Sequence, residues 1–148
     1  MRGFSIIELM VTLGVVGTLL GAAYPSVSAL AANYRLEGAA RNLALTLQKV
    51  RLRAVSEGRC FQVSFAAGAR TAQVAKKLGA SPCGSTGFSN DGAAQAIDDA
   101  GRIATSATAS AVFDTRGGAE TTSVITLTAP NGAVRLVAVN AVGRVNVQ

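Results

Sequence analysis

The sequence predicts an α+β protein in which one long N-terminal helix is followed by a domain of antiparallel strands. An uncharged apolar run over residues 9–32 continues without a linker into an amphipathic helical pattern. After Gly58 the periodicity changes to two, and strand-forming residues dominate the last third of the chain. The 148 residues leave room for one small domain beyond the first thirty or so. The apolar face of the sheet is expected to close over the helix.

The apolar run is long enough to cross a bilayer, since a spanning helix needs roughly 20 mostly apolar residues. Glu8 is unusual in this setting, because a lone carboxylate in lipid costs several kcal/mol and requires a cationic partner. A cleaved secretory signal ending at Ala29-Leu30-Ala31 and a plain membrane anchor are alternative interpretations. Against the signal peptide, one basic residue precedes a run that is longer than the usual ~7 to 15 residues.

The leader Arg2-Gly3-Phe4-Ser5-Ile6-Ile7-Glu8 resembles the class III leader of type IV pilins and type II secretion pseudopilins. This resemblance implies that a prepilin peptidase cleaves between Gly3 and Phe4 and that the new Phe4 amine is methylated. Glu8 and Pro25 then stand where the family commonly carries these residue types. The resemblance further implies that Glu8 pairs with a Phe4 amine, its own or a neighbouring subunit's, during filament assembly.

The expected location and partners follow from the same resemblance. The chain is expected to be a single-pass protein of the bacterial inner membrane with a periplasmic domain, or to be incorporated in a pilus or pseudopilus. Its expected partners are other pilin or pseudopilin subunits, the prepilin peptidase and the inner membrane. The domain organisation is a leader at 1–3, a transmembrane or filament-core helix at 4–32, an amphipathic half-helix at 33–58 and a globular β domain at 59–148.

Small residues punctuate the apolar half of the predicted helix. Gly17 and Gly21 form a G-x-x-x-G after Gly14, a spacing that lets transmembrane helices approach closely. Ordinary tolerance of glycine in membrane helices is the alternative. Pro25 removes a backbone donor and is expected to weaken or kink the helix.

The second half of the helix has one apolar face and basic sides. The helix is expected to run from about residue 4 to about residue 57, with Gly58 as its C-cap. The basic sides are read either as a binding surface for acidic partners or as a solvated face with subunit contacts. The apolar residues that recur at steps of four and three are Leu36, Ala40, Leu43, Leu47, Val50 and Ala54.

Strands are predicted at 60–65 and 72–75 as a hairpin, and at 111–113, 123–128, 134–139 and 142–147 as an antiparallel meander. Turns are expected at 114–118, at Pro130-Asn131-Gly132 and at Asn140-Ala141. Residues 79–92 are expected to form a surface loop, and 93–111 receive no assignment.

The chain has two cysteines and no histidine. In an exported domain, Cys60 and Cys83 most simply form one disulfide, worth about 3 kcal/mol, with two buried free thiols as the alternative. A structural zinc site needs four Cys or His ligands, so no metal site and no cofactor are expected. An enzyme is not expected either. There is no Ser-His or Cys-His arrangement and no phosphate-binding glycine loop, and the adjacent Asp98 and Asp99 would point to opposite faces of a strand.

The later part of the chain resembles the branch that joins FimT-type minor pilins with the H-type pseudopilin of type II secretion. The resemblance rests on the helix segment 47–59, a phenylalanine strand near 113–117 and a final Gly-Arg strand. It implies a minor pilin or pseudopilin, a non-enzymatic structural subunit of a type IV pilus or a type II secretion pseudopilus.

DNA binding in natural transformation is the alternative function. Some FimT-type proteins bind DNA through a C-terminal Gly-Arg-x-Arg motif, which here reads Gly143-Arg144-Val145-Asn146 and lacks the second arginine. The net charge of +6 favours acidic partners. Arg144, Arg135 and Arg116 are candidate phosphate contacts if the strands align them, and solvent-facing arginines are the competing explanation.

Overall fold

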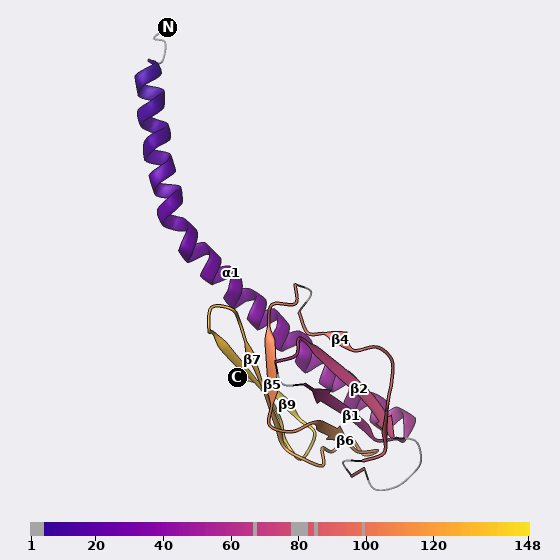
Figure 1. Cartoon of the computed structure of the whole chain (residues 1–148). Coiled ribbons are helices and arrows are strands. Elements are labelled where there is room, and N and C mark those ends of the chain that lie inside the picture. Colours follow the sequence, from indigo (N-terminus) through magenta and orange to yellow (C-terminus); the bar gives the residue numbers. More distant parts are fainter. Residues whose placement is uncertain (1–4, 67, 78–82, 85, 99) are drawn as a thin grey trace.

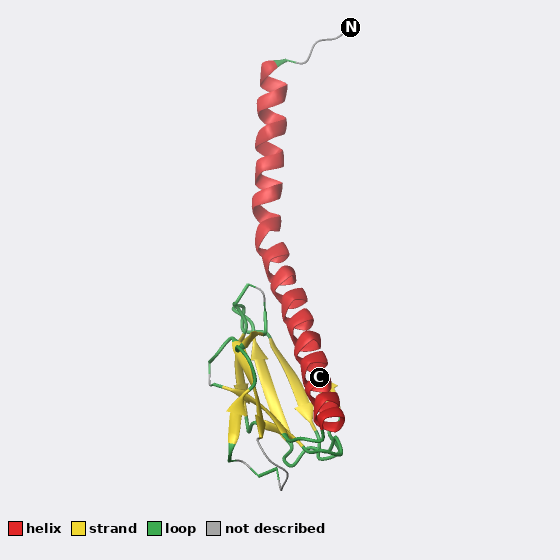
Figure 2. Cartoon of the chain, turned by 90° about the vertical axis from the view of Figure 1, so that its right-hand side faces the viewer, coloured by secondary structure: helices red, strands yellow, loops and turns green. Residues whose placement is uncertain are grey.

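The computed structural model describes residues 5–66, 68–77, 83–84, 86–98 and 100–148, and for residues 22–26 the backbone only. Its first element is the helix α1 (Ile6–Glu57), which runs without interruption from the apolar segment into the amphipathic one. The leading half of α1 projects away from the β domain, and the second half lies along it after a gentle bend (Figures 1 and 2). The helix ends as predicted at Gly58, which adopts a left-handed conformation with φ of 60°. The predicted start at residue 4 lies outside the described residues.

One sheet contains β1 (Phe61–Phe65), β2 (Thr71–Lys77), β3 (Phe88–Asn90) and β6 (Ala111–Phe113), in the order β3-β2-β1-β6, and β4 (Gln95–Ala96) also pairs with β2. The predicted hairpin is confirmed by the antiparallel pairing of β1 and β2, in which Phe61 lies opposite Lys76 and Phe65 opposite Ala72. The second sheet contains β5 (Ala104–Ala107), β7 (Ser123–Thr128), β8 (Val134–Val139) and β9 (Val145–Val147), in the order β5-β7-β8-β9.

The turns of the second sheet form where the sequence places them. Between β7 and β8, the Ala129 amide donates to the Ala133 carbonyl at 2.9 Å, and Gly132 has φ of 82°. Between β8 and β9, the Gly143 amide donates to the Asn140 carbonyl at 2.8 Å. This second turn extends further than predicted, so the last strand begins at Val145 instead of residue 142.

The predicted four-strand meander is wrong in its first strand, because β6 pairs with β1 and not with β7. The physical reason is burial on both faces of β6. Ala111 and Phe113 enter the main core, whereas Val112 packs in a separate cluster with the two cysteines. An apolar strand of this kind is favoured where both of its faces are covered, and β6 has such a position beside β1 at the edge of the first sheet.

Two further segments differ from the sequence prediction. Residues 79–92 are not entirely loop, because β3 pairs with β2 and places Phe88 opposite Lys77. Phe88 also packs against the cysteine cluster, which stabilises this short polar strand. The unassigned stretch 93–111 contributes β4 and β5, and its two isoleucines, Ile97 and Ile103, are buried in the core.

The hydrophobic core lies between the second half of α1 and the strands, as the helical pattern predicts. All six residues of the predicted apolar face are buried. They meet inward-facing side chains of both sheets, and a fully buried side chain of this size contributes about 1.5–3 kcal/mol. The largest strand contributions come from Phe61, Val63, Phe113, Ile125, Leu127, Val137 and Val139.

Candidate functional site

The leading half of α1 exposes large apolar side chains all around its circumference. Ile6 is 81% exposed and Ile7 is 71% exposed, and every large apolar side chain described between them and Leu30 is exposed as well. A helix that is apolar on all sides is stable only in an apolar environment, such as a bundle of other helices or lipid. Among the residues that the structure describes, no helix is long and apolar enough to cross a membrane.

Of the processing and assembly residues predicted from the leader, only Glu8 has a described side chain. Gly3 and Phe4 are outside the described residues, and of Pro25 only the helical backbone is described. Glu8 lies in the first turn of α1, and its side chain is exposed. Its backbone amide donates to the Ser5 carbonyl at 3.1 Å, so the helix begins just before the acid.

The glycines of the exposed half leave open surface. A side chain added at Gly14, Gly17 or Gly21 would meet no atom within 4 Å. Packing within the subunit therefore does not require glycine at these positions. It leaves flat places on α1 where a second helix can approach closely.

The outward face of the second half of α1 carries an apolar row that the sequence analysis missed. Leu45, Leu52 and Val55 are exposed on the side of α1 away from the core, and Leu52 is 69% exposed. The signal was present in the sequence, because Leu45 and Leu52 are seven residues apart and Val55 follows three residues later. A row at this spacing is typical of a seam that contacts another helix.

Two ion-pair clusters fix the domain to the helix. Glu37 on α1 accepts from Arg135 of β8 at 3.1 Å and from Arg41 at 3.0 Å, and these hydrogen bonds lower the pKa of the Glu37 carboxyl. Asp91, just after β3, contacts Lys76 at 2.7 Å and Arg53 at 2.8 Å, which lowers the pKa of its carboxyl. Arg53 also lies 4.7 Å from the centre of the Phe61 ring.

The three arginines proposed from the sequence as a DNA contact surface do not form one patch. Arg135 is near the start of β8 and is paired with Glu37. Arg144 lies beyond the other end of that strand, opposite Asn140, whose amide donates to the Arg144 carbonyl at 3.1 Å. Five residues of strand, about 17 Å, separate the two positions.

Arg116 and Arg144 do project from adjoining turns at the end of the domain where α1 terminates. The Ala119 amide donates to the Ala141 carbonyl at 3.0 Å and joins the two turns. Arg51 of α1 braces both turns, since its Nε donates to the Gly117 carbonyl at 2.7 Å and its Nη2 to the Val142 carbonyl at 3.2 Å. Arg51 belongs to the basic side of the helix, and no pattern in the sequence predicts this bracing contact.

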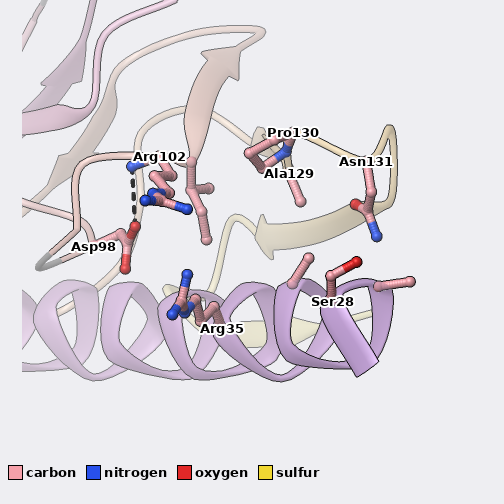
Figure 3. A pocket seen from close by; sticks show the side chains of 10 residues that line it. Ser28, Arg35, Asp98, Arg102, Ala129, Pro130 and Asn131 are labelled. Atoms are coloured by element: carbon pink, nitrogen blue, oxygen red, sulfur yellow. Dashed lines mark hydrogen bonds between the residues drawn. The ribbon is translucent and has the colours of Figure 1, made fainter. Parts of the chain in front are cut away.

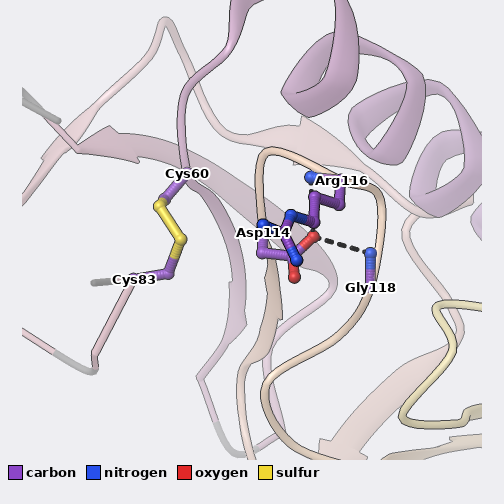
Figure 4. The surroundings of a disulfide bond; sticks show 5 residues. All are labelled: Cys60, Cys83, Asp114, Arg116 and Gly118. Carbon is purple, nitrogen blue, oxygen red and sulfur yellow. Dashed lines mark hydrogen bonds between the residues drawn. A yellow bond between two sulfur atoms is a disulfide. The ribbon is translucent and has the colours of Figure 1, made fainter. Parts of the chain in front are cut away.

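The predicted disulfide is present between Cys60 and Cys83, whose Cα atoms are 5.5 Å apart. Figure 4 shows it beside the turn that follows β6, where Asp114 Oδ1 accepts from the amides of Arg116 at 2.9 Å and Gly118 at 2.7 Å. Of the adjacent acids, Asp98 accepts from the Arg102 amide at 3.0 Å and Asp99 lies outside the described residues. The described part of the chain contains no group of three or more His, Cys, Asp or Glu placed to hold a metal ion.

Solved structures with the same fold include a minor pseudopilin and a type IV minor pilin. The minor pseudopilin EpsH from the type 2 secretion system of Vibrio cholerae superposes with a TM-score of 0.60 at 9% identity, over 77% of this chain and 96% of that one. The type IV minor pilin FimU of Pseudomonas aeruginosa gives a TM-score of 0.56 at 16% identity, over 78% of this chain and 90% of that one. At these identities the likeness establishes the fold alone.

Family models match both parts of the sequence. A search of curated proteins found no match. The prokaryotic N-terminal methylation motif matches residues 1–24, in agreement with the leader and its exposed helix. The model of the type II transport protein GspH matches residues 39–143, which include the last 19 residues of α1 and nearly all of the β domain. The chain therefore belongs to the GspH family within the pilin and pseudopilin superfamily.

Proposed function

We propose that this chain is a non-enzymatic minor subunit that assembles into a pseudopilus or a type IV pilus through α1. The single observation that carries the proposal is the exposed apolar surface of the leading half of α1, which packing within the subunit leaves uncovered. The occupant is a set of equivalent helices from other pilin-like subunits. The open surface at Gly17 and Gly21 and the outward row of Leu45, Leu52 and Val55 extend the same contact along the helix.

Before assembly, the subunit is held in the inner membrane by the leading half of α1, with its β domain in the periplasm. The methylation motif supports this placement, and so does the disulfide, because disulfides persist in oxidising compartments. The prepilin peptidase removes residues 1–3, and the Phe4 amine created by cleavage is methylated. Glu8 follows Phe4 by four residues in the sequence, so its carboxylate is a candidate partner for the amine of the same or a neighbouring chain.

Filament incorporation of a Glu8→Ala subunit tests the proposal. The variant is expected to be cleaved but to enter filaments poorly, because its neighbours retain an unpaired amine in an apolar environment. Glu120→Ala is the matched control, since Glu120 is an exposed acid of the β domain. Cleavage and incorporation of Glu8→Ala at the level of the control would contradict the proposed role of Glu8.

DNA binding is a second candidate function, supported by one observation. Arg116 and Arg144 are exposed on turns that Arg51 holds together, so two guanidinium groups are presented at one end of the domain. Phosphate contacts of this kind give affinity that falls with salt and does not depend on sequence. Titration of duplex DNA at several salt concentrations tests it. Loss of low-salt binding in Arg144→Ala, with Arg135→Ala unchanged, is expected, and equal affinity of wild type and Arg144→Ala would reject the candidate.

A further inference from the structure

A pocket of about 320 Å³ lies where α1 enters the β domain, at the end nearest the exposed half of the helix. Residues of α1 between Ser28 and Arg35 form its floor, and the β7–β8 turn at 129–131 forms one wall. The other wall comes from Asp98, Arg102 and Ile103 before β5. A neighbouring hollow of about 230 Å³ shares Arg35 and Asp98 and extends along the helix. The pocket therefore opens at the boundary between the apolar half of α1 and the domain.

Two guanidinium groups approach this pocket from opposite sides. Figure 3 shows Arg35 rising from α1 and Arg102 descending from the facing loop, with both side chains ending in the space between them. Asp98 lies beside Arg102 and accepts a hydrogen bond from its backbone amide at 3.0 Å. This contact positions the loop that carries Arg102.

Neither guanidinium is neutralised by an ion pair within the described residues. The carboxylates of Glu37, Glu57 and Asp91 pair with other cations of the domain, and none of these cations is Arg35 or Arg102. Two adjacent guanidinium groups left in this way form a site for an anion with several acceptor oxygens. A phosphate group suits them best, because it accepts paired hydrogen bonds from the planar guanidinium.

Apart from the two arginines, the pocket is lined by the polar Ser28 and Asn131, the carboxylate of Asp98 and several apolar side chains. Its walls include Ala29, Ala32, Pro130 and Ile103, and the Ile103 side chain is only 1% exposed. A concave site with two cations and an apolar wall fits an anion attached to an apolar body. The convex phosphate backbone of duplex DNA fits the exposed turns at the other end of the domain better than this recess.

The position of the pocket along α1 bears on the class of ligand. Arg35 follows the apolar run by three residues, about 4.5 Å of helix beyond Ala32. In a membrane-inserted subunit, this is the level of the lipid headgroups, where basic side chains contact anionic lipid. We propose that the pocket binds the phosphate of an anionic phospholipid headgroup while the subunit is in the membrane before assembly. The inference rests on the membrane placement given under the proposed function.

The test uses the full chain in micelles of a neutral detergent, titrated calorimetrically with dihexanoylphosphatidylglycerol. Binding with one site per chain is expected, tighter than for dihexanoylphosphatidylcholine or inorganic phosphate. Arg35→Gln and Arg102→Gln should each weaken it about tenfold, the effect of losing a charge-assisted hydrogen bond. Arg59→Gln is the matched control, because it makes the same change in net charge at an exposed position just beyond the far end of α1. Unfolding temperatures identify any variant that fails to fold. In that case Arg35→Lys and Arg102→Lys, which keep the charge, replace the glutamine variants and should bind with an affinity between those of the wild type and an arginine loss.

Several results would overturn the inference. Equal affinity for phosphatidylglycerol, phosphatidylcholine and inorganic phosphate would remove the anionic lipid as the ligand. Displacement of the lipid by a short DNA duplex would assign the pocket to nucleic acid. Arginine variants that bind like the control would show that the pocket is not the site. The outcome is distinct from that of the Glu8 experiment, since loss of lipid selectivity leaves Glu8-dependent assembly intact, and normal assembly of Glu8→Ala leaves the lipid affinities unchanged.

Discussion

Replacement of Arg51 by alanine should loosen the end of the β domain. The substitution removes the hydrogen bonds from Nε to the Gly117 carbonyl at 2.7 Å and from Nη2 to the Val142 carbonyl at 3.2 Å. A hydrogen bond from a charged donor contributes about 1.5–3 kcal/mol, and the longer, exposed one contributes less. Gly117 is buried, so its carbonyl would be left without the guanidinium partner. We therefore expect the free energy of unfolding to fall by about 2–3 kcal/mol.

Thermal unfolding and hydrogen exchange together measure this effect. A loss of 1 kcal/mol lowers Tm by roughly 4–8 °C in a domain of about 100 residues, so Arg51→Ala should lower it by roughly 10 °C or more. Exchange should accelerate at the amides of Gly143 and Ala119, which close the two braced turns. Arg51→Lys, which keeps the charge but not the planar fork, should lose about half as much.

Arg59→Ala is the control, because it removes an exposed arginine close to the end of the same helix. If Arg51→Ala and Arg59→Ala unfold at the same temperature and exchange alike at Gly143, the proposed brace does not exist.

Three further predictions follow from neighbouring features. Gly143→Ala should lower the free energy of unfolding by at least about 2 kcal/mol, because Gly143 has φ of 76° and an added Cβ would overlap the Gly117 carbonyl. Backbone strain of this kind costs ~1–3 kcal/mol, and the clash adds to it. Urea titration measures the loss, and a midpoint equal to that of the wild type would contradict it. Replacing Cys60 and Cys83 together by serine should cost about 3 kcal/mol in the chain-entropy model, and wild-type protein treated with a reductant should behave alike in the same titration. The Glu37 carboxyl should titrate in NMR below its ordinary value near 4.5, so its contribution to stability is present above that pH and is lost as pH falls through the lowered pKa; an ordinary pKa would show that its two arginine contacts do not form in solution.

The helix and the last three strands could be predicted because their signals are local. The apolar face of α1 repeats at helical spacing, and Gly58 ends the helix through its own left-handed conformation. The turn at Pro130-Asn131-Gly132 determines the pairing of β7 with β8 in the same way. Each of these features depends on residues close together in the chain.

The pairing of β6 was not predictable from local pattern. Its three residues are apolar in succession, which indicates burial on both faces but does not identify the neighbouring strand. The partner is β1, about fifty residues earlier, and the pairing is selected by Phe113 in the core and Val112 in the cysteine cluster. The same limit applies to β3, where a polar sequence is ordered by the contacts of Phe88.

The candidate sites likewise divide into those with a local sequence signal and those formed by residues far apart in the chain. The disulfide expected from the two cysteines is present, whereas the role of Glu8, implied by the resemblance of the leader, stays a prediction. Arg51 reaches turns that lie 66 and 91 residues further along the chain, and only the folded arrangement reveals that contact. Arg35 and Arg102 likewise meet at one pocket through packing of a loop on α1, which no sequence spacing encodes.

The central claim is that the leading half of α1 is covered by helices of other subunits, and photocrosslinking tests it most directly. A photoreactive amino acid replaces Val16, which is exposed on α1, and a second chain carries it at Leu43, which is buried in the core. In isolated filaments, the Val16 probe is expected to crosslink to other pilin-like subunits, and the Leu43 probe only within its own chain. Filaments that contain the subunit but give no intersubunit crosslink at Val16 would contradict the claim.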